Sequence, residues 1–224
     1  MRSVRFRDSV PRGCDEIEWY TDLRLPNVTN IQERTLALFQ QTGAYLNGHF
    51  RLTSGLHSPE YLQCALVLQH PQHAEELGRH LAAALRKLEP MRNIDAVVSP
   101  AMGGLIIGHE VARALNARHI FTERVDGKMT LRRGFAIKPG ETAVVIEDVI
   151  TTGGSSVEVI QLLKSVGVRV VGAGSIIDRS GGRADLGVPR VALAVMNVVT
   201  YDPSVCPLCA QGSQVVKPGS RASV

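Results

Sequence analysis

Between residues 31 and 88, apolar side chains recur at helical spacing. A helix is predicted over residues 31–42, because Asn30 can cap its start and Glu33 can complete a capping box. A second helix is predicted from Pro71, where apolar residues fall on one face of the helix every three or four positions. The polar, Gly-containing residues 47–63 between them include short pieces typical of strands.

From residue 94 onward, short apolar runs alternate with helical segments, a pattern typical of an α/β fold with a central parallel sheet flanked by helices. Strands are predicted over residues 96–99, 119–122, 143–146, 169–177 and 191–196, and helices over residues 105–115 and 156–166. Ligands of such sheets bind beyond the carboxyl ends of the strands. Loops reading SPAMGG, TERVDGK, EDVITTGGS and DRSGG follow four of these strands, so we expect one site at that edge.

The segment AVVIEDVITTGGSS, residues 143–156, has the richest candidate chemistry. An apolar run suits a buried parallel strand, and two adjacent carboxylates at its end can accept hydrogen bonds from sugar hydroxyls. The Thr, Gly and Ser loop that follows can wrap a phosphate with backbone N–H groups at the start of a helix. This order of residues predicts a site for a ribose phosphate.

Other phosphate-binding loops do not fit this segment. It lacks the GxxxxGK[ST] spacing, so no Lys is placed to reach a β/γ-phosphate pair, and it lacks the GxGxxG dinucleotide fingerprint. A purely structural alternative stays open, in which Gly153 and Gly154 make a tight turn and Glu147 and Asp148 cap a helix. The two carboxylates directly before the loop favour a sugar phosphate.

Composition changes this picture little. The chain has 224 residues, 44% hydrophobic and 21% charged, which is enough for one domain with a sizeable core. No apolar stretch approaches the roughly 20 residues of a membrane-spanning helix, so we expect a cytoplasmic protein with no membrane partner. The net charge of +4 suits small anionic ligands, and no aromatic residues interleave with the basic ones as nucleic-acid binding would require.

The segment 143–156 resembles the PRPP-binding motif of the type I phosphoribosyltransferases. The segments GHFRLTSGLHSPEYLQ, VVSPAMGGLIIGHEVARAL, LRRGF, IIDRSGG, CPLC and KPGSR resemble, more narrowly, the bacterial orotate phosphoribosyltransferase family. The likeness runs from about Gly43 to Arg221. It implies the type I fold, with a small amino-terminal hood over residues 43–70, and Mg²⁺-dependent reversible transfer of phosphoribosyl from PRPP to N1 of orotate. The products would be orotidine 5′-phosphate and pyrophosphate, in the synthesis of UMP.

The resemblance also implies roles for individual residues. The acidic pair would hold the ribose hydroxyls, with Asp148 also catalytic, and the loop after it would bind the 5′-phosphate. The PRPP-binding residues expected on this basis are Glu147, Asp148, Val149, Ile150, Thr151, Thr152, Gly153, Gly154 and Ser155. No protein residue is assigned to the metal, because Mg²⁺ is expected to be held mainly through PRPP.

By the same resemblance, Thr151 and Arg179 would contact orotate. A guanidinium suits the orotate carboxylate because it can donate two parallel hydrogen bonds. The alternative is a surface ion pair of Arg179 with Asp178 or Asp185.

Residues 124–133 are predicted to form a mobile loop, because they carry charge, a Gly and few apolar anchors. In the family such a loop closes over the neighbouring subunit's site, so a homodimer is implied, with Arg124 and Lys128 as the catalytic basic residues near the pyrophosphate. A solvated charged hairpin is the alternative. Thr53 and Gly103 stand where many relatives carry Lys, which leaves open which basic residue assists the leaving group.

Three further questions stay open at this stage. Residues 1–28 are interpreted as an extension of unknown role before a phosphoribosyltransferase domain over residues 29–224, which includes a tail from residue 201. Cys206 and Cys209 form a CxxC that is either half of a zinc site, completed by His residues or a second subunit, or a pair of reduced thiols; His49 and His57 have no assigned role. The alternative functions are transfer to a purine or another base, and a PRPP-sensing regulator.

Overall fold

The computed structural model describes residues 30–52, 54–88 and 93–218. The proposed extension over residues 1–28 and the position of Thr53 therefore lie outside the described residues. None of the helices in the described part is long and apolar enough to cross a membrane.

The central element is a six-stranded sheet with the order β5-β4-β3-β6-β7-β8, in which every neighbouring pair is parallel except β4 and β5. The prediction of a mostly parallel α/β sheet is confirmed. Its strands are β3 (Ala96–Pro100), β4 (Arg118–Val125), β5 (Lys128–Leu131), β6 (Thr142–Ile150), β7 (Arg169–Asp178) and β8 (Arg190–Val195).

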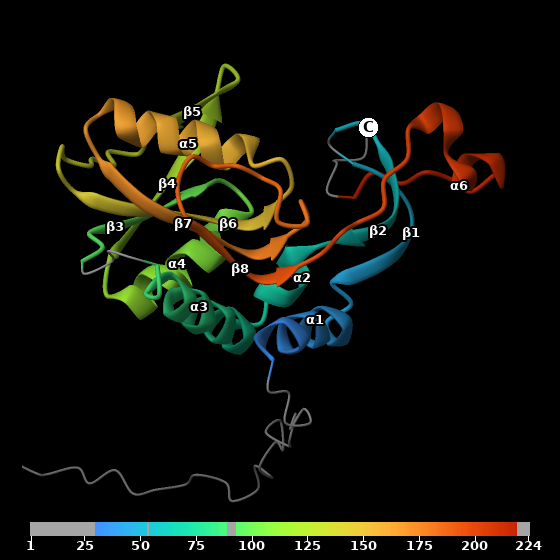
Figure 1. Cartoon of the computed structure of the whole chain (residues 1–224), viewed down its shortest axis with the longest axis horizontal. Helices are drawn as coiled ribbons and strands as arrows, with labels where there is room; N and C mark the ends of the chain where they lie inside the picture. The colour runs from blue at the N-terminus through green and yellow to red at the C-terminus, as the bar shows by residue number, and fades with distance from the viewer. Residues whose placement is uncertain (1–29, 53, 89–92, 219–224) are drawn as a thin grey trace, which may run out of the picture.

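Helices cover both faces of the sheet (Figure 1). On one face lies α5 (Gly154–Ser165), packed on a core that includes Val145 and Val159. On the other lie α1 (Ile31–Gln41), α2 (Cys64–Leu68), α3 (Pro71–Leu85) and α4 (Gly104–Leu115). Alternate residues of β6 serve the two cores, since Val144 and Ile146 pack on the α3 side and Ala143 and Val145 on the α5 side.

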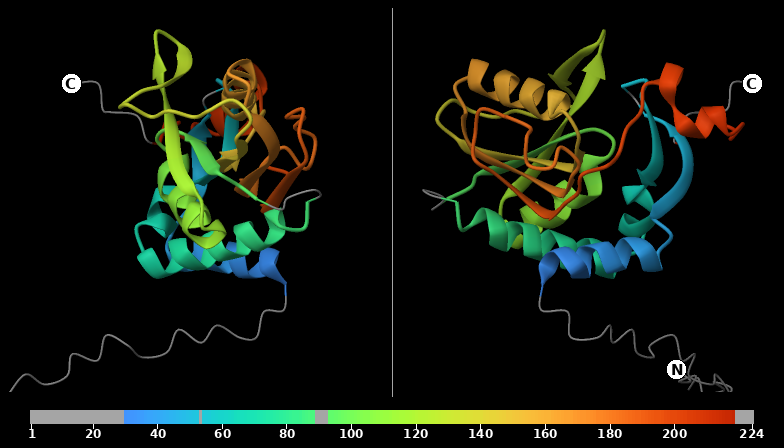
Figure 2. Two further views of the ribbon diagram at one scale, coloured as in Figure 1. Left: turned by 90° about the vertical axis from the view of Figure 1, so that its left-hand side faces the viewer. Right: turned by 45° about the vertical axis from the view of Figure 1, so that its right-hand side comes forward.

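A second, separate sheet stands beside the central one. Strands β1 (Tyr45–Arg51) and β2 (His57–Leu62) form an antiparallel hairpin, which we call the hood hairpin. The carboxyl-terminal segment, with the short helices η1 (Pro203–Val205) and α6 (Pro207–Ala210), lies against this hairpin and returns to it at Val216 (Figure 2).

Three details differ from the sequence predictions. Strand β6 does not end at residue 146 but continues through the acidic pair to Ile150, paired with β7. The side chain of Asn30 caps α1 by accepting from the Gln32 N–H, so the cap is not the expected box with Glu33. Residues 124–133 were expected to be a mobile loop, but β4 and β5 pair as a tight antiparallel hairpin, with Arg124 opposite Met129 and Val125 opposite Lys128.

Candidate functional site

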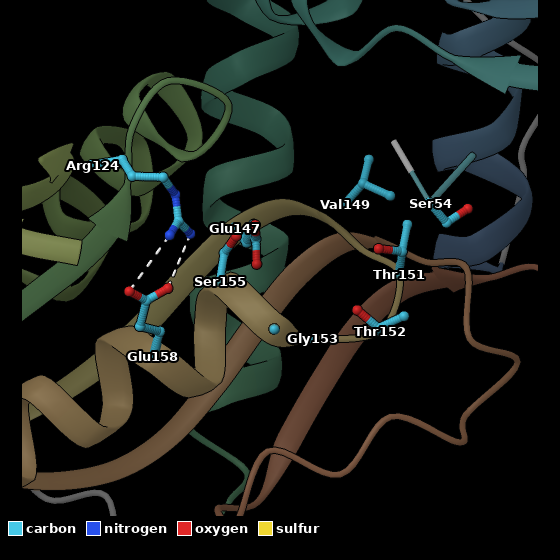
Figure 3. A pocket seen from close by; sticks show the side chains of 10 residues that line it. Ser54, Arg124, Glu147, Val149, Thr151, Thr152, Gly153, Ser155 and Glu158 are labelled. Atoms are coloured by element: carbon cyan, nitrogen blue, oxygen red, sulfur yellow. Dashed lines mark hydrogen bonds and ion pairs between the residues drawn. The ribbon is translucent and has the colours of Figure 1, made fainter. Parts of the chain in front are cut away.

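An open cavity of about 480 Å³ lies at the carboxyl end of β6 (Figure 3). Seven of the nine residues expected along the acidic loop line this cavity, whereas Asp148 and Ile150 do not. The lining residues are Ser54, Arg124, Glu147, Val149, Thr151, Thr152, Gly153, Gly154, Ser155 and Glu158. Ile150 is buried in the core, and its carbonyl accepts from the Arg179 N–H at 2.8 Å.

The loop between β6 and α5 is shaped by Gly153. This residue has φ +82, and a Cβ built on it would lie 2.4 Å from Cδ2 of Leu186, so only Gly fits without displacing the core. The exposed Thr151 and Thr152 side chains precede it, and α5 begins at Gly154. The first N–H groups of a helix have no acceptor within the helix, and its dipole favours an anion there. The loop can therefore receive a phosphate.

Glu147 faces the α5 side of the sheet. The hydroxyl of Ser156, in the first turn of α5, donates a hydrogen bond to Oε2 of Glu147. Burial raises the pKa of Glu147 to about 7; the hydrogen bond from Ser156 opposes this shift, and the nearby charge of Asp148 adds to it.

Asp148 faces the opposite side, towards α2 and α4. A Cβ built on Gly103 would lie 2.5 Å from Oδ1 of Asp148, so the absence of a side chain at Gly103 is what admits the carboxylate. Burial raises the pKa of Asp148, although the Val149 N–H, 2.9 Å from Oδ1, opposes the shift. The buried thiol of Cys64 neighbours the same carboxylate, and burial raises the pKa of this thiol well above its usual value.

Arg179 follows the last residue of β7 and is directed towards the hood hairpin. Its Nε atom is buried and has no hydrogen-bond partner among the described residues. Burial lowers its pKa, and the neighbouring charges of Tyr61 and Glu60 on β2 oppose that shift. An unpaired, desolvated guanidinium is costly unless a ligand pairs with it.

The alternative surface ion pair of Arg179 is wrong for both candidates. Asp178 is fully buried and pairs with Arg190, which also donates from Nε to the Ala184 carbonyl at 2.8 Å. Asp185 accepts from the Gly187 N–H at 2.9 Å.

The structure separates Arg124 from Lys128. Arg124 lines the cavity, and its Nη2 lies 3.0 Å from Oε2 of Glu158 on α5 (Figure 3). Lys128 is exposed beyond the turn and is not among the residues that line the cavity. Met129 is buried and its N–H donates to Glu158 at 2.7 Å, a contact that joins β5 to α5.

Sequence reasoning missed the hood-side neighbours of the site. Tyr61, Glu60 and Cys64 interact with Arg179 or Asp148, yet no local motif marks them. The strand-like pieces predicted within residues 47–63 include Glu60 and Tyr61, but they do not show which side chains face a ligand.

Comparison with known proteins agrees with this geometry. The phosphoribosyl transferase domain family matches residues 67–188. An orotate phosphoribosyltransferase of Desulforamulus reducens is 54% identical over 190 residues, covering 85% of this chain and 97% of the relative. The chain belongs to the orotate phosphoribosyltransferase family. A second relative of the same name, from Pelotomaculum thermopropionicum, is 55% identical over 85% of this chain and 98% of its own length.

Solved structures of the orotate phosphoribosyltransferase family share the fold. The crystal structure of orotate phosphoribosyltransferase from Aeropyrum pernix superposes with a TM-score of 0.58 at 27% identity, covering 71% of this chain and 92% of that one. The family match over residues 67–188 contains the acidic pair, the phosphate loop, Gly103 and Arg179, whereas the hood hairpin and the tail lie outside it.

Proposed function

We propose that this orotate phosphoribosyltransferase transfers the phosphoribosyl group of PRPP to N1 of orotate, reversibly and with Mg²⁺, giving orotidine 5′-phosphate and pyrophosphate for UMP synthesis. The observation that carries the proposal is Arg179, a half-buried side chain whose buried Nε has no hydrogen-bond partner in the described residues, beside the acidic pair and a phosphate loop at one sheet edge. A purine base has no carboxylate to pair with it.

The 5′-phosphate of PRPP would bind the loop from Thr151 to Ser155. Its anionic oxygens would accept from the N–H groups at the start of α5 and from the exposed Thr151 and Thr152 hydroxyls. Gly153 holds this loop in shape, because its left-handed φ and contact with Leu186 exclude a side chain.

The ribose would lie over the end of β6. Because Glu147 and Asp148 point to opposite faces of the strand, a sugar bound there would meet one carboxylate on each side. Hydrogen bonds from ribose hydroxyls favour the charged form of both carboxylates and would offset the burial that now raises their pKa values.

Orotate would lie between β7 and the hood hairpin. Arg179 would pair with its carboxylate, and Thr151, beside the strand end, would contact both substrates. The charges of Glu60 and Tyr61, on β2, act on Arg179 and oppose the lowering of its pKa by burial. The hood hairpin would exclude water from the base.

Bond breaking at C1 places positive charge on the ribose and negative charge on pyrophosphate. Arg124 and Lys128 would be the basic residues that face the leaving group, with Lys128 supplied across a homodimer, since it does not line the cavity of its own chain. Gly103, which stands where many relatives carry Lys, cannot assist the departure of pyrophosphate, because it has no side chain and lies against Asp148.

The residues fit an oxygen-ligated metal held mainly by substrate. Mg²⁺ prefers oxygen ligands, and the carboxylates of Glu147 and Asp148 are such donors. When bound, Mg²⁺ would neutralise part of the pyrophosphate charge.

The same proposal covers the organisation of the chain. Residues 29–224 would form the catalytic unit, with a hood over 43–70 and a tail over 201–224, and residues 1–28 would be an extension. We also propose a cytoplasmic homodimer that acts on PRPP and orotate, without a nucleic-acid or membrane partner.

The test is a nucleotide-formation assay with PRPP, Mg²⁺ and each of orotate, uracil, hypoxanthine and adenine. Of the four bases, only orotate is expected to be converted to a nucleotide. Conversion of hypoxanthine or adenine, with no conversion of orotate, would overturn the proposal. Arg179→Ala should raise KM for orotate by at least about tenfold, because a charge-assisted hydrogen bond to the carboxylate is lost. PRPP affinity should change little. Asp148→Asn should instead weaken PRPP binding, measured by calorimetry.

A further inference from the structure

Four metal-ligating side chains meet outside the proposed active site. They are His49 on β1, His57 on β2, and Cys206 and Cys209 at the start of α6 and within it. One donor atom from each lies within 4.8 Å of all the others. His49, His57 and Cys206 are buried, while Cys209 is exposed and offers a path for an ion. The sequence placed the two His residues about 150 positions from the CxxC, so only the fold unites them.

Three of the six donor–donor separations fit a tetrahedral ion, a fourth is shorter, and all lie within 4.8 Å. Zinc–sulfur bonds of about 2.3 Å and zinc–nitrogen bonds of about 2.0 Å place tetrahedral nitrogen and sulfur ligands roughly 3.5 Å apart. Nε2 of His49 lies 3.6 Å from Sγ of Cys206 and 3.7 Å from Sγ of Cys209. Nδ1 of His57 lies 3.3 Å from Sγ of Cys209 and 2.9 Å from Nε2 of His49.

The tautomer of His49 is fixed by a contact outside the cluster. Its Nδ1 lies 2.9 Å from the Ser213 carbonyl, which can only accept, so Nδ1 carries the proton and Nε2 presents a lone pair. That lone pair faces the His57 nitrogen and both sulfurs. A backbone carbonyl that orients a ligating imidazole in this way is the usual support of a His–metal bond.

We propose that His49, His57, Cys206 and Cys209 bind a structural Zn²⁺ that fastens the carboxyl-terminal segment to the hood hairpin. Two thiolates and two neutral imidazoles with no open position form a closed structural zinc site. The proposal is independent of the catalytic function, because it depends on none of the residues assigned to PRPP or orotate.

The contacts around the four ligands show what the ion would hold. The tail follows the hairpin on both sides of them: Tyr201 exchanges backbone hydrogen bonds with His57, and the Arg51 N–H donates to the Val216 carbonyl at 2.8 Å. In Figure 1, α6 lies beside the hairpin at the edge of the molecule, remote from the central sheet. The central core gives little support there, so a metal supplies stability that burial does not.

The hood hairpin also carries residues of the proposed base site. His57 begins β2, and Glu60 and Tyr61, whose charges act on Arg179, lie in the same strand. Removal of the ion should therefore loosen the tail first and the orotate side of the site second, and should leave the phosphate loop of α5 unaffected.

The first test is the metal content of untagged full-length protein from zinc-supplemented cells, purified without chelator. Elemental analysis should give about one Zn per chain. Cys206→Ser and Cys209→Ser should each lose it, whereas Cys64→Ser, a matched thiol control outside the cluster, should retain it. Wild-type protein that holds no zinc after incubation with Zn²⁺ and desalting would overturn the proposal, as would retention of zinc by both cluster variants.

A second test uses only the wild-type chain, because loss of zinc in a variant could also result from misfolding. Co²⁺ exchanged into the protein should give the strong visible and near-ultraviolet bands of a tetrahedral thiolate site. Cys209, although exposed, should resist alkylation in the Zn²⁺-loaded protein and react after chelation, with a lower Tm. Weak, octahedral Co²⁺ absorption, or rapid alkylation of Cys209 with Zn²⁺ bound, would refute the assignment.

Discussion

Glu147 and Asp148 are adjacent in β6, yet their carboxylates point to opposite faces of the sheet, Glu147 towards Ser156 on α5 and Asp148 towards Gly103 and Cys64. Adjacent residues of a strand must diverge in this way, and the strand continues through the pair to Ile150. Each carboxylate therefore has its own environment, and substitution of each should have a distinct effect.

We expect Glu147→Gln to stabilise the protein above neutral pH while it weakens PRPP binding. Burial raises the folded-state pKa of Glu147 to about 7, above its unfolded value of 4.5. The folded state therefore binds the proton more tightly, and the contribution of Glu147 to stability falls as pH rises from 4.5 through 7. Removing the charge should add roughly 1–3 kcal/mol to the free energy of unfolding at pH 8.5 and little at pH 4.5.

Urea unfolding at the two pH values measures this difference, and Ser156 can still donate to the new amide oxygen. A gain of equal size at both pH values would show that the carboxylate is not the cause. Unchanged PRPP affinity, by calorimetry, would remove Glu147 from the ribose site.

Gly103→Ala should lower kcat/KM by displacing the carboxylate of Asp148. The new Cβ would lie 2.5 Å from Oδ1 of Asp148, and relief of such overpacking costs about 1–3 kcal/mol. The matched control is the same substitution in an Asp148→Ala background, where the clash is absent. Equal effects of Gly103→Ala on stability in the two backgrounds would mean that the two residues do not interact.

The fold could be predicted from the sequence wherever one periodic pattern extended over a whole element. The apolar runs of β3, β6 and β7 and the amphipathic face of α3 gave the central sheet and its covering helix, and the acidic pair with its Gly-rich loop gave the phosphate end of the site. These signals are local.

Long-range contacts could not be predicted in the same way. The Met129 N–H joins β5 to Glu158 on α5, and Asp178 pairs with Arg190, twelve residues along the chain, and not with Arg179. The cluster of His49 with Cys206 joins opposite ends of the chain. The residues of each contact lie too far apart in the sequence for a local pattern to join them. Only the folded structure shows that they meet.

Arg190→Leu should destabilise the protein strongly. Asp178 has a 1% exposed side chain, and although burial opposes its charge, hydrogen bonds from Ser180 and the ion pair with Arg190 hold its pKa below the usual value. Loss of one partner of a buried pair costs about 3–5 kcal/mol, because the remaining charge is uncompensated.

The matched control is Arg113→Leu, which removes surface ion pairs with Glu110 and Glu75 and should cost about 1 kcal/mol or less. Since the pKa of Asp178 is depressed, its stabilisation is present above pH 3.8 and is lost as pH falls through the folded-state value. Similar unfolding midpoints for the two variants in urea would contradict this account.

Glu158→Gln should lower KM for PRPP, because Arg124 would be freed for the pyrophosphate. Nη2 of Arg124 now lies 3.0 Å from Oε2 of Glu158, an exposed pair of the kind worth about 0.2–1 kcal/mol, so the expected decrease is about fivefold at most. The Gln side chain can still accept from the Met129 N–H, which keeps β5 in place while it removes the charge. Arg124→Ala should act in the opposite direction and raise KM, and the double variant should match Arg124→Ala. Initial rates at varied PRPP measure all three; a decrease in KM from Glu158→Gln that persists without Arg124 would show that Glu158 acts on PRPP directly rather than by holding the guanidinium.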